Sequence, residues 1–151
     1  MDIYSQLGLL YTNVLTEIIF TVSGFSFDVL DQEQDTEFED MVGIMSLNGK
    51  KNGMLFLSAK EADIRELCSY MIGVNRSEVT NADIEDALRE LVNMVAGSAK
   101  LRLSSSDYIF NLSPPFVIKG KNISLATKDR MHIISRVLGN GELSVKLKVI
   151  Y

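Results

Sequence analysis

Cysteine and histidine are scarce in this sequence of 151 residues, which contains one of each. Cys68 has no second cysteine to pair with, so a disulfide framework is excluded, and its place in a helical pattern predicts a buried thiol. His132 lies in an apolar run without a neighbouring carboxylate or cysteine, which favours neither a metal ligand nor a general base. We therefore expect no metal site and no cofactor of the protein's own.

Positive charge and uninterrupted hydrophobic segments are also in short supply. The 15 Lys and Arg residues are outnumbered by 20 Asp and Glu residues, and the resulting net charge of −5 argues against nucleic acid as a partner. The first apolar segment has no basic residues before it and is interrupted by Glu17, so we expect neither a signal peptide nor a membrane span. These features predict a cytoplasmic protein with no membrane partner.

The hydrophobic pattern predicts an α+β fold in a single domain, residues 1–151, because no linker or low-complexity stretch divides the chain. Helical spacing extends over residues 2–22 and 59–72, and a third helix is expected to begin at a cap near Thr80 and Asp83. Strand patterns occupy residues 25–29, 41–47, 54–57, 108–112, 131–138 and 142–151, with another near Val117. Residues 48–53 and 139–141 predict hairpins, and the acidic run 31–40 predicts a solvated loop.

The third predicted helix carries a narrow polar stripe. At about 100° per residue, Asp86, Glu90 and Asn93 fall at roughly 0°, 40° and −20°, and Gly97 continues the same line. The opposite arc is apolar and is expected to be buried; it contains Ile84, Leu88, Leu91, Val92 and Val95. By geometry alone the stripe fits an ordinary solvated helix face as well as a docking surface. A carboxylate and a carboxamide on it could bind a cation and orient a water molecule.

The residues around the stripe resemble a known family. The pattern Asp86-x3-Glu90-x2-Asn93 is followed by Met94-Val-Ala-Gly97-Ser-Ala-Lys100 and later by Asn111-Leu-Ser-Pro114-Pro115. These motifs resemble the CheC/CheX/FliY family of bacterial chemotaxis phosphatases, and within it the CheX branch. Pro115 stands one residue earlier than the family's usual spacing from the Asn.

The resemblance implies an activity, a partner and roles for these residues. It implies a phosphatase that hydrolyses the aspartyl phosphate of a CheY-like response regulator in two-component signalling, with Mg²⁺ supplied by the regulator's active site. Glu90 and Asn93 would then be catalytic: Asn93 positions the water and Glu90 docks onto a lysine of the regulator. Asp86 and Gly97 would contribute to partner docking. The alternative is a non-catalytic interaction domain of the same fold in chemotaxis or flagellar-switch signalling.

A weak internal repeat favours the CheX branch. Residues 13–24 align without a gap with residues 86–97, and Leu15, Glu17, Val22 and Gly24 match their counterparts. The repeat suggests a pseudo-twofold arrangement, each half a long helix followed by antiparallel strands and a hairpin. Phe20 occupies the position of Asn93 and cannot orient a water molecule, so we expect one functional site per chain, as in CheX.

The last predicted strand bears on oligomeric state. From Leu143 to Val149 apolar residues alternate with Ser144, Lys146 and Lys148, which predicts a half-buried strand at the edge of a sheet. Members of the CheX branch are homodimers that associate through their sheets, so the resemblance implies a homodimer here. Lysines also protect bare edges in monomers, which leaves the monomeric alternative open.

Overall fold

The structure is a computed structural model that describes residues 1–31, 37–128 and 130–151. Its helices are α1 (Ile3–Ser23), α2 (Glu61–Ile72), α3 (Asn81–Arg102) and a short 3₁₀ helix, η1 (Arg76–Glu78). Its strands are β1 (Asp28–Asp31), β2 (Met41–Gly49), β3 (Gly53–Ala59), β4 (Phe110–Asn111), β5 (Phe116–Lys119), β6 (Ile133–Gly139) and β7 (Ser144–Ile150).

The predicted helices and hairpins are confirmed, with corrections at their ends. Ala59, predicted to begin the second helix, is the last residue of β3, and α2 follows an extended Lys60. The first strand begins at Asp28 rather than near Phe25. Half of the predicted acidic loop, residues 32–36, lies outside the described residues. Local pattern therefore located the elements, whereas the exact ends depend on neighbouring chain segments.

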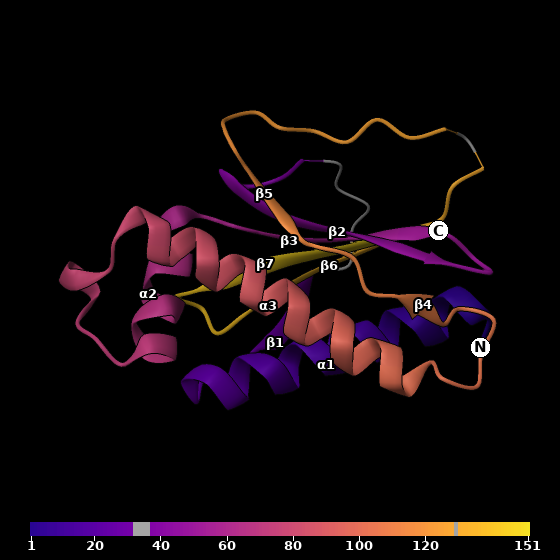
Figure 1. The fold of residues 1–151 in the computed structure, drawn as a ribbon, viewed down its shortest axis with the longest axis horizontal. Coiled ribbons are helices and arrows are strands. Elements are labelled where there is room, and N and C mark those ends of the chain that lie inside the picture. The colour runs from indigo at the N-terminus through magenta and orange to yellow at the C-terminus, as the bar shows by residue number, and fades with distance from the viewer. Residues whose placement is uncertain (32–36, 129) are drawn as a thin grey trace.

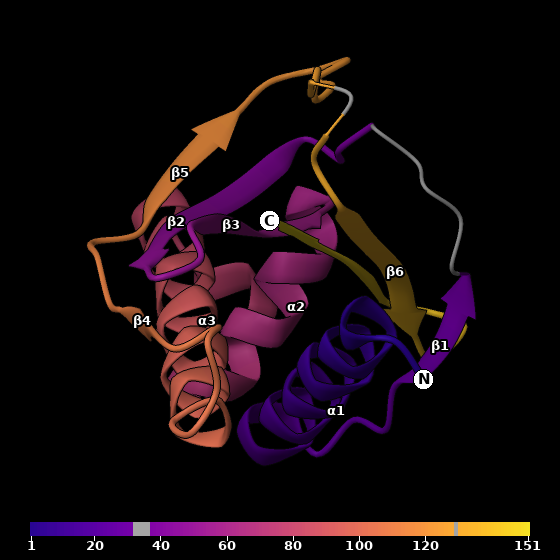
Figure 2. The ribbon, with the colours of Figure 1, turned by 90° about the vertical axis from the view of Figure 1, so that its right-hand side faces the viewer.

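Within the described residues, seven strands form one antiparallel sheet in the order β1-β6-β7-β3-β2-β4, with β5 also paired to β2. The sheet curves around the three long helices, which all lie on one face (Figure 2). Residues 120–128, which follow β5, cross the opposite face (Figures 1 and 2). The main core fills the space between sheet and helices, and a smaller cluster around Val42, Ile44, Phe56 and Ile150 lies on the other face. None of the helices in the described ranges is long and apolar enough to cross a membrane.

The strand pairing supports the pseudo-twofold repeat. The hairpins β2–β3 and β6–β7 meet at the centre, where β3 pairs with β7. On one flank β1, from the first half, pairs with β6 of the second; on the other, β5 of the second half pairs with β2 of the first. Each half therefore completes the other's sheet. The helices α1 and α3 occupy equivalent places, and α2 lies between the two halves in the chain.

The prediction that the final strand lies at a sheet edge is wrong. β7 is an interior strand between β6 and β3. Its alternating lysines do not indicate a bare edge, because Lys148 is only 1% exposed and its Nζ lies 5.3 Å from the centroid of the Phe38 ring. The alternation marks two differently covered faces of a central strand. Any argument for a dimer must therefore rest on β1 or on the β4 and β5 flank.

Candidate functional site on helix α3

The start of α3 is defined by side chains that satisfy its first backbone groups. Thr80 Oγ1 accepts a hydrogen bond from Asp83 N at 3.1 Å, and Asp83 Oδ2 accepts one from Thr80 N at 2.9 Å. This reciprocal capping box confirms the predicted cap. The cap fixes the residue at which α3 begins.

The apolar arc of α3 holds the helix tightly against the sheet. All five residues predicted for this arc are buried: Ile84, Leu88, Leu91, Val92 and Val95. A Cβ atom at Gly43 of β2 would lie 2.7 Å from Val92 Cγ2 and 3.0 Å from Leu88 Cγ, so the absence of a side chain there lets the helix approach. The opposite face of α3 is thereby held in one orientation toward solvent.

The polar stripe lies on that outer face. Asp86, Glu90 and Asn93 are all exposed, and Gly97 follows them one turn later. A Cβ atom at Gly97 would meet nothing within 4 Å, so open space lies beside it. The structure thus places all four predicted site residues on one ridge of α3, which is the helix nearest the viewer in Figure 1.

The charges along the ridge are only partly neutralised. Among the described residues, neither the Glu90 nor the Asn93 side chain has a hydrogen-bond or ion-pair partner. Asp86, by contrast, accepts a hydrogen bond from Arg89 at 2.9 Å. Beside the stripe, Nζ of Lys119 on β5 lies 2.5 Å from Oε1 of Glu85. The hydrogen bond from Lys119 and its positive charge lower the pKa of the Glu85 carboxyl group. Glu90 and Asn93 are therefore the two groups available to an incoming partner.

Sequence reasoning did not anticipate that Asp86 is already paired. Arg89 stands three residues later on the same helix, a spacing at which side chains meet, so the signal was present in the sequence. Arg89 binds the Oδ1 atom of Asp86 and so neutralises part of its charge. Leu101 also continues the stripe one turn beyond Gly97 and is 77% exposed.

The equivalent face of α1 differs in both chemical groups. Glu17, which aligns with Glu90, forms an ion pair with Arg102 from the last turn of α3. Phe20, which aligns with Asn93, is 59% exposed and offers no hydrogen-bonding group. In this half the carboxylate is engaged and the amide is absent.

The ridge has the chemistry to bind and orient, not to form a covalent intermediate. A free carboxylate can pair with a cation, and a carboxamide can accept a hydrogen bond from a water molecule and donate one of its own. Within the described ranges, no group of three or more His, Cys, Asp or Glu residues is placed to hold a metal ion.

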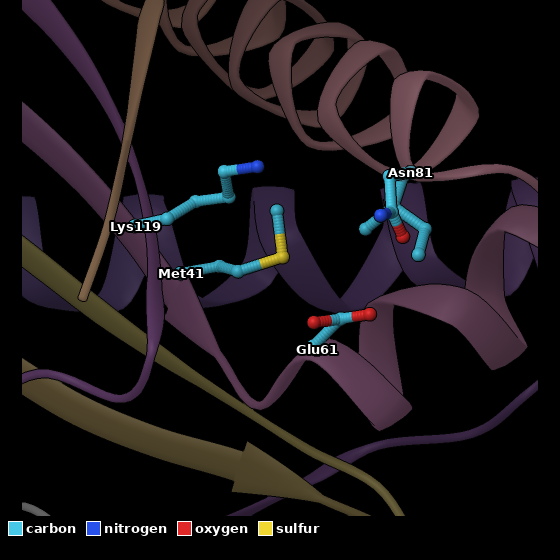
Figure 3. Close-up of a pocket in the computed structure, with 5 residues that line it drawn as sticks. Met41, Glu61, Asn81 and Lys119 are labelled. Carbon is cyan, nitrogen blue, oxygen red and sulfur yellow. The ribbon is translucent and has the colours of Figure 1, made fainter. Parts of the chain in front are cut away.

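A small cavity lies beside the start of α3 and is separate from the polar stripe. It has a volume of about 40 Å³ and lies near the N-terminal ends of α2 and α3, with Glu61, Asn81 and Lys119 in its lining (Figure 3). That volume is enough for one or a few water molecules. None of the four stripe residues lines it.

Solved structures place the fold in a class. Chemotaxis protein CheX from Vibrio vulnificus superposes with a TM-score of 0.82 at 20% identity, covering 95% of this chain and 97% of that one. A CheC-like superfamily protein from Shewanella sp. PV-4 gives a TM-score of 0.82 at 22% identity, covering 99% and 98%. A chain of the CheX–CheY–BeF3–Mg²⁺ complex from Borrelia burgdorferi gives a TM-score of 0.71 at 14% identity, covering 94% of this chain and 96% of that one. The chain thus has the CheC-like fold.

The sequence itself identifies the family. The family model described as chemotaxis phosphatase CheX matches residues 41–137, more than half of the chain, and this range contains Asp86, Glu90, Asn93 and Gly97. No curated protein matches the sequence. This chain belongs to the CheX family of chemotaxis phosphatases.

Proposed function

We propose that this protein hydrolyses the aspartyl phosphate of a CheY-like response regulator in the cytoplasm, with Asn93 positioning the attacking water. The observation that carries the proposal is the unpaired Glu90 and Asn93 on the exposed ridge of a helix whose other side is buried. Membership of the CheX family and the CheX–CheY complex of a structural neighbour support a regulator of this type as the substrate.

The reaction needs little from this chain beyond position. A water oxygen forms a bond to phosphorus as the bond from phosphorus to the regulator's aspartate oxygen breaks. The products are orthophosphate and a free carboxylate, and the water's surplus proton passes to the phosphate or to solvent. The regulator's own active site would supply Mg²⁺, which would neutralise charge on the phosphoryl oxygens. The Asn93 amide oxygen accepts a hydrogen bond from the water and aligns it with the phosphorus–oxygen bond that breaks.

The other stripe residues serve docking. Glu90 lies about one helical turn before Asn93, where its carboxylate can pair with a lysine beside the regulator's phosphorylation site. Asp86 extends the acidic part of the ridge one further turn toward the N-terminus of α3 and is paired with Arg89. The missing side chain at Gly97 lets the partner's surface approach the helix backbone closely.

Single-turnover dephosphorylation tests the proposal. Receiver domains phosphorylated with a small phosphodonor in Mg²⁺ are mixed with wild-type protein or with Asn93→Ala, and loss of the phosphoryl group is followed. We expect acceleration by the wild type and a loss of about a hundredfold or more in the variant, the scale on which one preorganised hydrogen-bonding group contributes to catalysis. The variant should keep its fold because Asn93 is exposed.

Phe20→Ala is the matched control, because Phe20 occupies the equivalent position on α1 and is also exposed. It should leave the rate unchanged. Full activity in Asn93→Ala would show that the assigned mechanism is wrong. Binding of a phosphorylated receiver domain without any acceleration would instead identify a non-catalytic interaction domain.

A further inference from the structure

The ridge on α3 does not end at Gly97. Leu101 follows Gly97 by four residues, which places it within roughly 20° of Glu90 around the helix axis. It is 77% exposed, and among large hydrophobic residues in the described part of the chain only Met1 is more exposed. An isobutyl side chain therefore stands in water in line with the residues proposed to meet the regulator.

Packing within the chain requires neither an apolar side chain at Leu101 nor the absence of a side chain at Gly97. Single exposed leucines are common on protein surfaces, and leucine is a good helix former. Gly97 is not explained in this way, because glycine weakens a helix interior and a Cβ atom there would touch nothing. The helix surface is therefore bare at Gly97 and apolar one turn later at Leu101. A partner could approach the backbone at the glycine and bury the leucine.

The two ends of the ridge also differ in charge. The half that contains Glu90 is acidic, whereas Leu101 is flanked by Lys100 and by Arg102, which is paired with Glu17. A partner that presents a cation to Glu90 can meet Leu101 in only one of the two orientations along the helix. Asn93 and Leu101 are eight positions apart, roughly 12 Å along the axis, so one partner domain can cover both.

We propose that Leu101 is an apolar docking contact for the receiver domain of the response regulator and fixes the orientation in which that domain lies along α3. This inference rests on the proposed function, because it takes the occupant to be the regulator whose phosphoryl group faces Asn93. Leu101 touches no reacting atom in this arrangement. Leu101 therefore contributes to the affinity for the regulator and leaves the rate of the chemical step unchanged.

The test separates binding from chemistry. For Leu101→Ala and Leu101→Asp, KM and kcat are measured with the phosphorylated receiver domain, and Kd with the same domain carrying beryllofluoride and Mg²⁺. We expect KM and Kd to rise about fivefold or more for the alanine variant, and further for the aspartate variant, because buried leucine surface is lost. The value of kcat should stay within about twofold of wild type, and Leu101→Met should restore binding because it keeps an apolar side chain of similar size.

Leu30→Ala is the matched control. Leu30 is 55% exposed and lies on β1, at the flank of the sheet opposite α3. Its variant should bind and turn over like the wild type. An active wild type whose Leu101 variants keep its KM and Kd overturns this inference alone. A wild type that neither binds nor dephosphorylates any receiver domain overturns the proposed function and this inference together.

Discussion

Two glycines on opposite sides of the site helix show how one residue type serves different ends. Gly43 faces the buried arc of α3, where a Cβ atom would collide with Val92 and Leu88. Gly97 lies within α3 on its outer side, where a Cβ atom would meet open space. The close packing of α3 on β2 explains why position 43 has no side chain. No contact within the isolated chain explains why position 97 has none. A residue that lowers stability without a packing reason is a mark of function.

Substitution at Gly97 should therefore raise stability and lower activity. Gly97→Ala replaces the most flexible residue in a helix interior, and the free energy of unfolding measured with urea should rise by about 0.5–1 kcal/mol. The bulkier Gly97→Leu should also fold, but it should reduce kcat/KM toward a phosphorylated receiver domain because its side chain keeps the partner from the helix backbone. Undiminished kcat/KM in Gly97→Leu would contradict a docking role for this position.

At the scale of elements, what could be predicted from the sequence is what depends on nearby residues. The cap at Thr80 and Asp83, the glycine-rich hairpins and the buried arc of α3 each involve groups a few positions apart, and each is confirmed. The candidate stripe was also visible, because helical phase alone brings Asp86, Glu90, Asn93 and Gly97 together.

The neighbours of a strand could not be predicted in the same way. The lysines of β7 alternate as they would at a bare edge, yet Met54 pairs with Ile150, and Phe38 covers Lys148. These contacts join segments far apart in the chain, and no local pattern encodes them. The pairing of Asp86 with Arg89 is a different case, since its spacing was visible and only the choice of rotamer was not.

Because α3 packs closely on Gly43 of β2, adding a side chain at this position should disturb the packing. Gly43→Ala inserts a methyl group against Val92 and Leu88 and should destabilise the protein by about 1–3 kcal/mol, as overpacked cores do. Urea unfolding measures the change directly. Because the substitution also pushes on the helix that carries Asn93, turnover should fall in the folded variant. Equal stability of Gly43→Ala and wild type would show that α3 can shift without cost.

For the whole molecule, we propose that residues 1–151 form one domain that associates as a homodimer. The sheet joins the two halves through β3 and β7, and one core cluster takes residues from all three long helices. The flank at β5 provides a surface for association, because Phe116 and Ile118 lie on this strand, which pairs with β2, and are 47% and 42% exposed. Exposed apolar side chains on an edge strand favour pairing with another copy.

Light scattering across micromolar concentrations checks the dimer, which should have a mass near twice the 16.8 kDa of one chain. Phe116→Lys combined with Ile118→Lys should shift the mass toward that of the monomer, because charged side chains block edge pairing. The same pair of changes on the helix side of the molecule, Leu9→Lys with Phe20→Lys, serves as the control and should leave the mass unchanged. A monomer at every concentration would contradict the dimer.

The interior position of β7 also has a consequence for biosynthesis. Translation proceeds from the N-terminus, so β3 and β6 leave the ribosome before the strand that joins them. Until residues 144–150 emerge, each presents an unpaired backbone edge, which is a site for pairing with other nascent chains. A chaperone that holds the nascent chain would therefore matter most just before these residues appear. A premature stop before residue 144 would remove β7 and leave the middle of the sheet open.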